Sequence, residues 1–392
     1  MIIYRKDFLK TFYGCGGMRN EASTTMEIKK MNRQHVFNLI YQRKKVSKQD
    51  IVYELKMSLP TVTQNLKDLS KMGLITNAGT FESTGGRKAQ VLTCVNDVKI
   101  AIGLDITRNH IGIVAIDLAG DILATQRIRF PFGANDEYYR NVGSFIDAFV
   151  ERNRFDPAKI IGVGIAVPAL ISEDESMVVY GAILQNTGET CLRFSHYIAY
   201  PCILCHDSEV AGFAEFWVAN NVKNVFYISL GNSIGGAVFF DNMKYLGDTR
   251  CSGEIGHMII VPEGKKCYCG QRGCFDTYCA ATVLADTAKG SLEDFFLLLE
   301  QGEKKTVKIW NVYLDHLSLA IHNTIMLFDC TVILGGYVGV YMEKYSEVLQ
   351  EKVEAQNPFK MNRSVIKICQ YKTEAIAAGA ALRHIERFIK AI

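Results

Sequence analysis

Four side chains of types that bind metal ions lie between residues 257 and 274, in the stretch HMIIVPEGKKCYCGQRGC. They are His257, Cys267, Cys269 and Cys274. Three thiolates and one imidazole complete a tetrahedral shell around Zn²⁺ and leave no position open, which is typical of a structural zinc site. Gly264, Gly270 and Gly273 permit the sharp turns that such a loop requires. The alternative is a set of free thiols beside an unrelated histidine.

The rest of the chain indicates a reducing compartment, where cysteines are thiols or metal ligands rather than disulfides. Near residue 1 there is no basic segment followed by an apolar core and a cleavage site, so we expect no secretory signal. The longest apolar run, residues 160–171, contains two glycines and a proline and is too short to cross a bilayer. We therefore expect a cytoplasmic protein without a membrane segment. Its 392 residues suffice for two or three domains.

Charge is distributed unevenly along the chain. Residues 1–95 contain 16 Lys and Arg against 7 Asp and Glu, a balance of +9. The remainder contains 28 against 34, a balance of −6, and the two parts sum to the net charge of +3. A basic segment on an acidic body suggests that the first segment binds a polyanion. The alternative is a basic surface that is merely solvated.

Residues 31–95 have the pattern of a winged helix-turn-helix domain, whereas residues 1–30 have little periodicity and are expected to form a flexible tail. Val36, Leu39 and Ile40 share one face of a first helix. Ser47 and Ser58 can each cap a further helix. Two helices joined by a three-residue turn are the helix-turn-helix arrangement, whose later helix lies in the major groove of DNA.

The helix after Ser58 is the expected recognition helix. Val62, Leu66 and Leu69 form its buried stripe. The opposite face carries the candidate DNA contacts Thr61, Thr63, Gln64, Asn65 and Lys67. Amide side chains suit bidentate contacts to adenine, and Lys suits phosphate.

Residues 74–95 are expected to form a strand, a turn and a second strand, which together make a wing. Gly85 and Gly86 form its bend, and Arg87 and Lys88 lie at its tip. Two cations there are well placed to contact phosphates or the minor groove. We therefore expect operator DNA as a partner; the alternative is a winged helix that contacts only another protein.

From residue 96 the pattern becomes α/β. We expect strands at residues 100–105, 110–117 and 122–130, a helix at 137–152, a buried strand from residue 160, and a strand that ends at His206 and Asp207 before a helix. A strand, a Gly-rich turn and a strand recur about 120 residues after the first of these strands. Two such units predict two lobes around a cleft.

Several segments, in order along the chain, resemble the ROK family of repressors, open reading frames and kinases. They are STGGRKAQVL at 83–92, LGNSIGGAVF at 230–239, GEIGH at 253–257 with CYCGQRGC at 267–274, ILGGYVG at 333–339 and AIAAGAAL at 375–382. The resemblance covers roughly residues 30–390, and the cysteine signature is its most specific part. It implies an actin/hexokinase-like ATPase fold behind the winged helix. The lobes would span residues 96–215, completed by a C-terminal helix at 373–392, and residues 216–372 with the zinc loop.

The resemblance also implies a sugar site. Glu254 and His257 match sugar contacts of ROK kinases, and Asp207 matches their catalytic base. His206 and Asp276 stand at further sugar contacts, where the kinases have Asn and Glu. In this interpretation His257 binds zinc through one ring nitrogen and the sugar through the other.

Two phosphate loops bear on whether such a chain is a kinase or a sensor. Gly231, Gly235 and Gly236 match the family's second phosphate turn. At the first loop the kinases have Asp-x-Gly-Gly-Thr, whereas this chain has residues 105–109, Asp-Ile-Thr-Arg-Asn. Without those glycines the backbone cannot closely approach a triphosphate. We therefore expect no catalytic residue and no kinase activity.

The expected function is a sugar-responsive transcriptional repressor that binds its operator as a homodimer or homotetramer. A small sugar or a sugar phosphate would be the effector, and Zn²⁺ the structural cofactor. The alternative is an ATP-dependent sugar kinase with a regulatory DNA-binding head.

Overall fold

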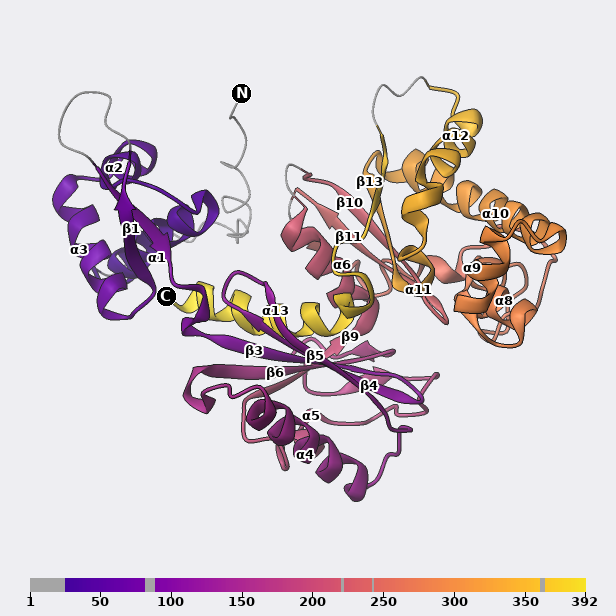
Figure 1. Cartoon of the computed structure of the whole chain (residues 1–392), viewed down its shortest axis with the longest axis horizontal. Coiled ribbons are helices and arrows are strands. Elements are labelled where there is room, and N and C mark those ends of the chain that lie inside the picture. Colours follow the sequence, from indigo (N-terminus) through magenta and orange to yellow (C-terminus); the bar gives the residue numbers. More distant parts are fainter. Residues whose placement is uncertain (1–24, 82–88, 220–221, 242, 360–363) are drawn as a thin grey trace.

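A computed structural model describes residues 25–81, 89–219, 222–241, 243–359 and 364–392, and shows a helical head followed by an α/β body (Figure 1). The head comprises α1 (Thr25–Arg43), α2 (Lys48–Leu55), α3 (Leu59–Lys71) and the antiparallel pair β1 (Ile75–Thr80) and β2 (Gln90–Cys94). The winged arrangement is confirmed. The expectation of a flexible tail through residue 30 is wrong for residues 25–30, which belong to α1; residues 1–24 lie outside the described residues.

Capping determines where α2 and α3 begin. The Ser47 hydroxyl accepts a hydrogen bond from the Asp50 N–H, and the Asp50 carboxylate accepts one from the Ser47 N–H, which completes a capping box. The Ser58 hydroxyl accepts from the Thr61 N–H at 3.3 Å. Gly73 follows α3 with φ of +72°, the left-handed conformation that commonly ends a helix. The predicted caps are therefore confirmed.

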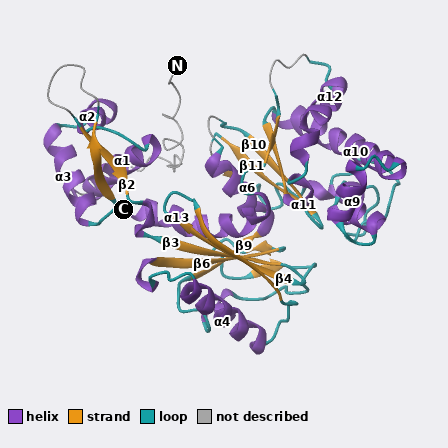
Figure 2. Ribbon diagram, viewed as in Figure 1, coloured by secondary structure: helices purple, strands orange, loops and turns teal. Residues whose placement is uncertain are grey.

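Two five-stranded sheets with the same topology form the body (Figure 2). The first sheet has the order β5-β4-β3-β6-β9 and comprises β3 (Ile100–Ile106), β4 (His110–Asp117), β5 (Ile122–Arg129), β6 (Ile160–Val167) and β9 (Cys202–His206). The second has the order β12-β11-β10-β13-β14 and comprises β10 (Val225–Leu230), β11 (Ile234–Phe240), β12 (Met243–Tyr245), β13 (Thr331–Gly335) and β14 (Ile366–Ile368). In each, an antiparallel meander is extended by two parallel strands. The predicted recurrence is confirmed.

Two helices lie between the sheets. α13 (Ala375–Ala391) packs on the first sheet, α6 (Asp207–Val218) packs on the second, and the two helices pack on each other. Small residues permit this contact: a Cβ on Gly103 would lie 1.7 Å from the Ala377 carbonyl oxygen, and one on Gly379 would lie 1.8 Å from the Val210 carbonyl oxygen. The backbone of α13 therefore touches that of β3 on one side and that of α6 on the other.

Other helices cover the outer faces of the sheets. α4 (Asp136–Arg152) and α5 (Cys191–Ser195) cover the first sheet, beside the short hairpin β7 (Leu170–Ile171) and β8 (Val178–Tyr180). The second sheet is accompanied by α7 (Asp276–Cys279), α8 (Ala281–Ala285), α9 (Leu292–Glu300), α10 (Lys304–Phe328), α11 (Gly336–Gly339) and α12 (Ser346–Gln356). Among the described residues, no helix combines the length and the apolar character needed to span a bilayer.

The head is attached to the body through α1. The Tyr41 hydroxyl donates to the Leu118 carbonyl oxygen at 2.9 Å, and its ring meets Trp217 edge-on at 6.3 Å between centroids. Arg33 donates through Nε to the Ile392 carbonyl oxygen at 2.7 Å, at the end of α13. One apolar cluster continues from the head into α6, α13 and the first sheet. The end of α13 therefore lies against the head (Figure 1).

Candidate functional sites

The four predicted metal ligands converge in the segment between β12 and α7. Their ligand atoms all lie within 4.8 Å of one another. Nδ1 of His257 is 3.8 Å from Sγ of Cys267, and the sulfurs of Cys269 and Cys274 are also 3.8 Å apart. Two sulfurs on a tetrahedral Zn²⁺, each at about 2.3 Å, are separated by about 3.8 Å, whereas a disulfide requires about 2 Å. The donor set and its spacing therefore fit Zn²⁺.

Backbone contacts hold this loop without a regular helix or sheet. The Cys267 N–H donates to the Gln271 carbonyl oxygen at 2.8 Å, and an isolated bridge pairs Ile259 with Cys274. Gly273 has φ of +82°, and a Cβ there would lie 1.8 Å from the Val261 carbonyl oxygen. Glycine is therefore required where the loop turns back toward its own start.

Tyr268 is a residue that sequence analysis missed at this loop. It lies between two of the metal ligands and is 60% exposed. Its hydroxyl is 3.4 Å from Nε2 of His257, the nitrogen opposite the one that faces Cys267. Partial burial, followed by the charges of Asp276, Cys267 and Glu254, raises the pKa of this hydroxyl. Tyr268 therefore lies among the predicted sugar contacts, and its aromatic type within the Cys-x-Cys motif is the only signal of this in the sequence.

A second cluster forms where β9 meets the loop that precedes the metal ligands. Nε2 of His206 is 3.3 Å from Oδ1 of Asp207 and 3.9 Å from Oε1 of Glu254. His206 is the last residue of β9 and Asp207 the first of α6. Asp207 is held there because its Oδ1 accepts from the Ser208 N–H at 2.6 Å. The structure thus brings together three of the predicted sugar contacts, whose binding role stays a prediction.

Asp276 has a structural partner. It is buried, and its Oδ1 accepts a hydrogen bond from the Ile234 N–H at 2.6 Å. Burial raises the pKa of this carboxyl group. One of its oxygens is therefore occupied in bracing the Gly-rich turn between β10 and β11, and its predicted contact with a sugar stays a prediction.

Asp105, which sequence analysis placed at the first phosphate loop, forms a group with Arg127 and Tyr337, which sequence analysis did not place at the site. Asp105 pairs with Gly112 across β3 and β4, and Gly112 pairs with Arg127 across β4 and β5. Because Gly112 has no side chain, Arg127 can extend across β4 toward Asp105. Its Nη2 donates to the Tyr337 hydroxyl at 3.4 Å, and its guanidinium carbon lies 5.7 Å from the centre of that ring. The first sheet thereby contacts α11, beside the second sheet.

Asp207 connects this group to the second cluster. Burial, followed by the charge of Asp207, raises the pKa of Asp105 to about 7, and the charge of Arg127 opposes the rise. Burial, followed by the charge of Asp105 and then that of Asp207, raises the pKa of Tyr337, and Arg127 opposes the rise. We refer to Asp105, Asp207 and Glu254, with the His206 ring between the last two, as the carboxylate cluster. The strand register of the β3–β5 meander would have sufficed to predict that Arg127 lies near Asp105. No sequence feature near Arg127 predicts its contact with Tyr337.

The turn between β3 and β4, at residues 107–109, is closed by side chains. The Thr107 hydroxyl donates to the His110 carbonyl oxygen and accepts from the His110 N–H, both at 3.1 Å. Arg108 donates through Nη2 to the Ile183 carbonyl oxygen at 2.9 Å. The space that the resemblance would leave for a phosphate is therefore bordered by Thr, Arg and Asn.

The β10–β11 hairpin uses glycines for close packing: Gly231 lies in its turn, and Gly235 and Gly236 lie in β11. A Cβ on Gly235 would lie 2.0 Å from the Ser208 hydroxyl oxygen, and one on Gly236 would lie 2.8 Å from the Gly253 carbonyl oxygen. A Cβ on Gly231 would meet nothing closer than the Ser233 carbonyl oxygen at 3.1 Å. Close packing therefore accounts for the glycines at positions 235 and 236. Phosphate binding by these glycines and by Gly231 stays a prediction.

Asn186 is a further candidate that sequence analysis missed. It is buried between β8 and α5, and neither atom of its side-chain amide has a hydrogen-bond partner among the described residues. Its segment is contacted by Arg108 through Ile183. A buried amide without partners is unfavourable, which makes Asn186 a candidate for a ligand hydroxyl.

The recognition helix exposes part of the predicted DNA-binding face. Thr63, Gln64 and Lys67 are exposed, whereas Thr61 is half-buried with its hydroxyl 2.8 Å from that of Ser58. The placement of Asn65 on this face is wrong: it is only 7% exposed and its Nδ2 donates to the Thr61 carbonyl oxygen at 2.8 Å. Position 65 shares the buried stripe because it follows Val62 by three residues. The wing bend Gly85-Gly86 and the tip residues Arg87 and Lys88 lie outside the described residues.

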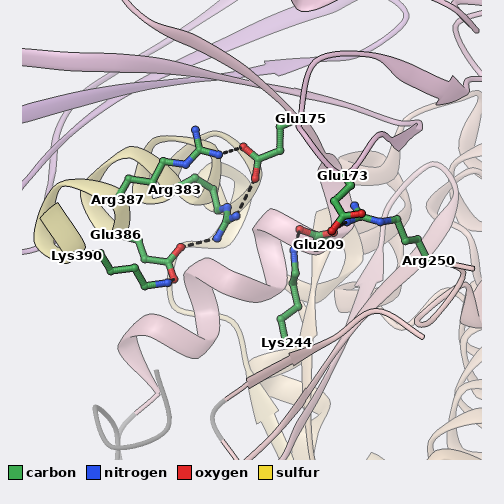
Figure 3. A network of polar contacts seen from close by, with 9 residues as sticks. All are labelled: Glu173, Glu175, Glu209, Lys244, Arg250, Arg383, Glu386, Arg387 and Lys390. Atoms are coloured by element: carbon green, nitrogen blue, oxygen red, sulfur yellow. Dashed lines mark hydrogen bonds and ion pairs between the residues drawn. The ribbon is translucent and has the colours of Figure 1, made fainter. Parts of the chain in front are cut away.

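Ion pairs link α13 to the β7–β8 hairpin, α6 to β12 of the second sheet, and the hairpin to the loop after β12 (Figure 3). Arg383 pairs with Glu175 at 2.8 Å and also with Glu386, and Arg387 pairs with Glu175. The remaining pairs are Lys390 with Glu386, Lys244 with Glu209, and Arg250 with Glu173 at 4.0 Å. Each of these cations therefore already has a carboxylate partner.

A winged-helix head, two sheets of identical topology and a Cys₃His loop together define a winged helix fused to an actin/hexokinase-like body. The profile of the ROK family matches residues 101–386, and the chain belongs to that family. The resemblance inferred from the sequence is confirmed.

Similarity to curated relatives and to solved structures covers both the winged-helix head and the body. The chain is 26% identical to the xylose repressor of Bacillus subtilis (strain 168), over 80% of this chain and 78% of that protein. It is 23% identical to the N-acetylglucosamine repressor of Escherichia coli O157:H7, over 72% and 68%.

Among solved structures, a ROK family transcriptional regulator, a homolog of the E. coli MLC protein, has a TM-score of 0.74 at 21% identity, covering 93% of this chain and 97% of that one. A ROK family glucokinase from Streptomyces griseus, in complex with glucose and AMPPNP, has a TM-score of 0.60 at 20% identity, covering 72% and 98%. The two structures support the fold.

Proposed function

We propose that this protein is a sugar-responsive, DNA-binding transcriptional repressor whose kinase-like body binds a sugar without phosphorylating it. The observation that carries the proposal is the exposed face of α3, with Thr63, Gln64 and Lys67, on a winged helix that packs against the body. The relatives named repressors support it. A head that recognises DNA and a body that binds an effector are the two parts that regulation requires.

In the body, the proposed sugar contacts are His206, Asp207, Glu254, His257 and Asp276. Carboxylates accept hydrogen bonds from hydroxyl groups, and a histidine can donate one. Cys267, Cys269 and Cys274 would hold Zn²⁺ together with Nδ1 of His257. The bound ion would fix the loop that presents Glu254 and Nε2 of His257 to the ligand.

The loss of kinase activity belongs to the same proposal. A kinase must hold nucleotide phosphates with backbone N–H groups and a metal ion. Here the β3–β4 turn is closed by Thr107 and Arg108, which supports a sensor over an enzyme. An assay of ADP formation over a panel of hexoses and pentoses tests this: we expect none above background. Turnover that Asp207→Asn abolishes would instead establish the kinase.

DNA binding is tested by fluorescence anisotropy on the promoter region upstream of the protein's own gene. We expect affinity that falls steeply with salt, as counterions are released from the phosphates. Lys67→Ala should weaken binding to all sequences and reduce the salt slope by about one ion. Gln64→Ala should instead reduce the preference for the operator over random DNA.

Two outcomes would contradict the DNA-binding proposal. Equal effects of Gln64→Ala on operator and random DNA would place α3 outside the major groove. Binding to a protein that is insensitive to salt and to charge reversal at Arg87 and Lys88 would instead indicate a recruitment module.

We further propose that the repressor acts in the cytoplasm as a homodimer or homotetramer, because paired heads can read two half-sites one helical turn apart. Sedimentation analysis tests the assembly.

A further inference from the structure

We infer that the tip of the β7–β8 hairpin is a strap that transmits a movement between the two sheets to the winged-helix head. The strap comprises residues 172–177, which join β7 to β8. The inference rests on the proposed function and names the contacts that couple effector binding to DNA binding. Three features carry it: the arginines of α13 that hold the strap, the end of α13 at the head, and a contact from the strap to the second sheet.

One carboxylate holds the strap on α13. Glu175 accepts from Arg383 at 2.8 Å and pairs with Arg387, one helical turn further along α13 (Figure 3). The side chains of Glu175 and Arg383 are only 17% and 19% exposed, so salt and water screen this pair less than a surface pair. Glu175 also has φ of +59°, a conformation that residues other than glycine rarely adopt and that persists where surrounding contacts impose it. The position of the strap is therefore determined by α13.

The strap is also bound to the strand that ends at the carboxylate cluster. The Glu175 carbonyl oxygen accepts from the N–H of Leu204 in β9 at 2.9 Å. Within the strap, the Asp174 carboxylate accepts from the hydroxyls of Ser172 and Ser176 at 2.6 and 2.7 Å. These bonds make the strap compact, so a displacement of one part of it also moves Glu175.

α13 connects the strap to the head. Beyond the two arginines, Lys390 pairs with Glu386 at 2.7 Å. The carbonyl oxygen of Ile392 accepts from Nε of Arg33 at 2.7 Å, and that of Lys390 accepts from the side-chain amide of Gln34. The last carbonyl groups of α13 therefore hold α1, the first helix of the head. A shift of α13 must either move α1 or break these bonds.

The strap reaches the second sheet through a longer contact. Glu173 lies 4.0 Å from Arg250, in the loop that follows β12 and continues to Glu254. Glu173 is 92% exposed, so the pair contributes little at this distance. An effector bound between Asp207 and Glu254 would draw this loop toward the first sheet and shorten the pair. The attraction between the two charges would then displace the strap.

These contacts define two arrangements of the body. In the arrangement described here, Glu175 pairs with both arginines and the contact between Glu173 and Arg250 is long. In the second arrangement that contact is short, and the strap is displaced along α13. An effector shifts such an equilibrium only by its preference for one arrangement. The strap links that preference to the position of α1.

The first test measures how a sugar changes the DNA affinity of the full-length, zinc-loaded protein. Fluorescence anisotropy on the promoter fragment is compared with and without saturating xylose, glucose or N-acetylglucosamine. For the wild type we expect at least one of these sugars to change DNA affinity by about tenfold, a typical allosteric coupling. Glu175→Gln keeps the shape but removes the charge that holds both arginines, and should reduce this change to less than about threefold. Calorimetry should show that the variant still binds the same sugar.

Charge exchange tests the contact with the second sheet. Glu173→Arg places a cation against Arg250 and should also reduce the response to the sugar. Adding Arg250→Glu should restore it, because the pair is then attractive again. The matched control is Asp315→Asn, which removes the 2.6 Å ion pair between α10 and Lys352 of α12 and should leave the response unchanged.

A second measurement needs no sugar. In Glu175→Gln, hydrogen exchange of backbone amides should become faster in the last turns of α13 and in α1, and should not change in α12. Unchanged exchange in α1 would overturn the inference, whatever the sugars do.

The failure of the strap and the failure of the sensor are distinguishable. Equal sugar responses of the wild type and Glu175→Gln would overturn the strap and leave the proposed sensor intact. A double variant at positions 173 and 250 that fails to regain the response would overturn the contact with the second sheet. A wild type whose DNA affinity ignores every sugar would reject the proposed sensor and, with it, the coupling assigned to the strap.

Discussion

The two body sheets share one topology, but the turns that follow their first strands are built differently. The β3–β4 turn is closed by the side chains of Thr107 and Arg108. After the β10–β11 turn, β11 lacks side chains at Gly235 and Gly236, and so this hairpin packs against Ser208 and the loop that carries Glu254. One fold can therefore build its first hairpin with side chains or with bare backbone, and only the second arrangement brings the hairpin against the loop that leads to the predicted metal ligands.

Removing a predicted metal ligand should have the largest effect on stability, and this effect should be confined to the second sheet and the loop beside it. We expect Cys267→Ser to lose bound zinc and several kcal/mol of unfolding free energy, because structural zinc contributes directly to folding. Metal analysis and denaturant unfolding measure both quantities. Cys251→Ser, at an exposed thiol outside the metal cluster, should change neither. Hydrogen exchange of the backbone amides shows which sheet is affected. An equal change in both sheets would contradict a role of the metal that is confined to the second sheet.

Asp105 should make the first sheet sensitive to pH. Its pKa of about 7 in the folded protein lies above its ordinary value of 3.8. Folding therefore takes up a proton between these values, and stability falls as the pH rises through this window. We expect Asp105→Asn to exceed the wild type in unfolding free energy by about 2–4 kcal/mol at pH 8, with the difference vanishing near pH 4. Urea unfolding at both pH values measures this, with Asp97→Asn as the control. A constant difference would contradict the shifted pKa.

The glycines of the second turn should differ from one another. Gly235→Ala places a methyl group against Ser208 and should cost about 1–3 kcal/mol through overpacking. Gly231→Ala, whose nearest neighbour is farther away, should cost less. Chemical denaturation of the two variants measures the difference. Equal losses would indicate that packing does not distinguish these positions.

The first turn should respond to the loss of one hydroxyl. Thr107→Val removes the two hydroxyl hydrogen bonds to the His110 backbone, keeps the backbone bond between the two residues and the shape of the side chain, and should cost about 1 kcal/mol of unfolding free energy. Thr76→Val, at an exposed position of β1, should be nearly neutral. A neutral Thr107→Val would show that the turn does not depend on its side-chain bonds.

Errors in the sequence-based predictions came from contacts that local patterns do not encode. The capping signals at Ser47 and Ser58 were sufficient because a cap involves residues only three positions apart. Asn65 was misplaced because its polarity suggested solvent, whereas its amide is satisfied within α3 by the Thr61 carbonyl oxygen. A buried polar group is acceptable once it is hydrogen-bonded, and polarity alone does not reveal that partner.

The sequence by itself indicated the winged helix, the strands of the first meander, the four predicted metal ligands and the family, since these depend on spacing along the chain. Only the tertiary structure decided that Arg127 crosses Gly112 to reach Tyr337, which is 210 residues away. It also decided that Asp276 braces the turn at Ile234. Such contacts follow from how two sheets and the helices between them pack. The surroundings of a charge, and therefore the ligand that it favours, depend on that packing rather than on residue type.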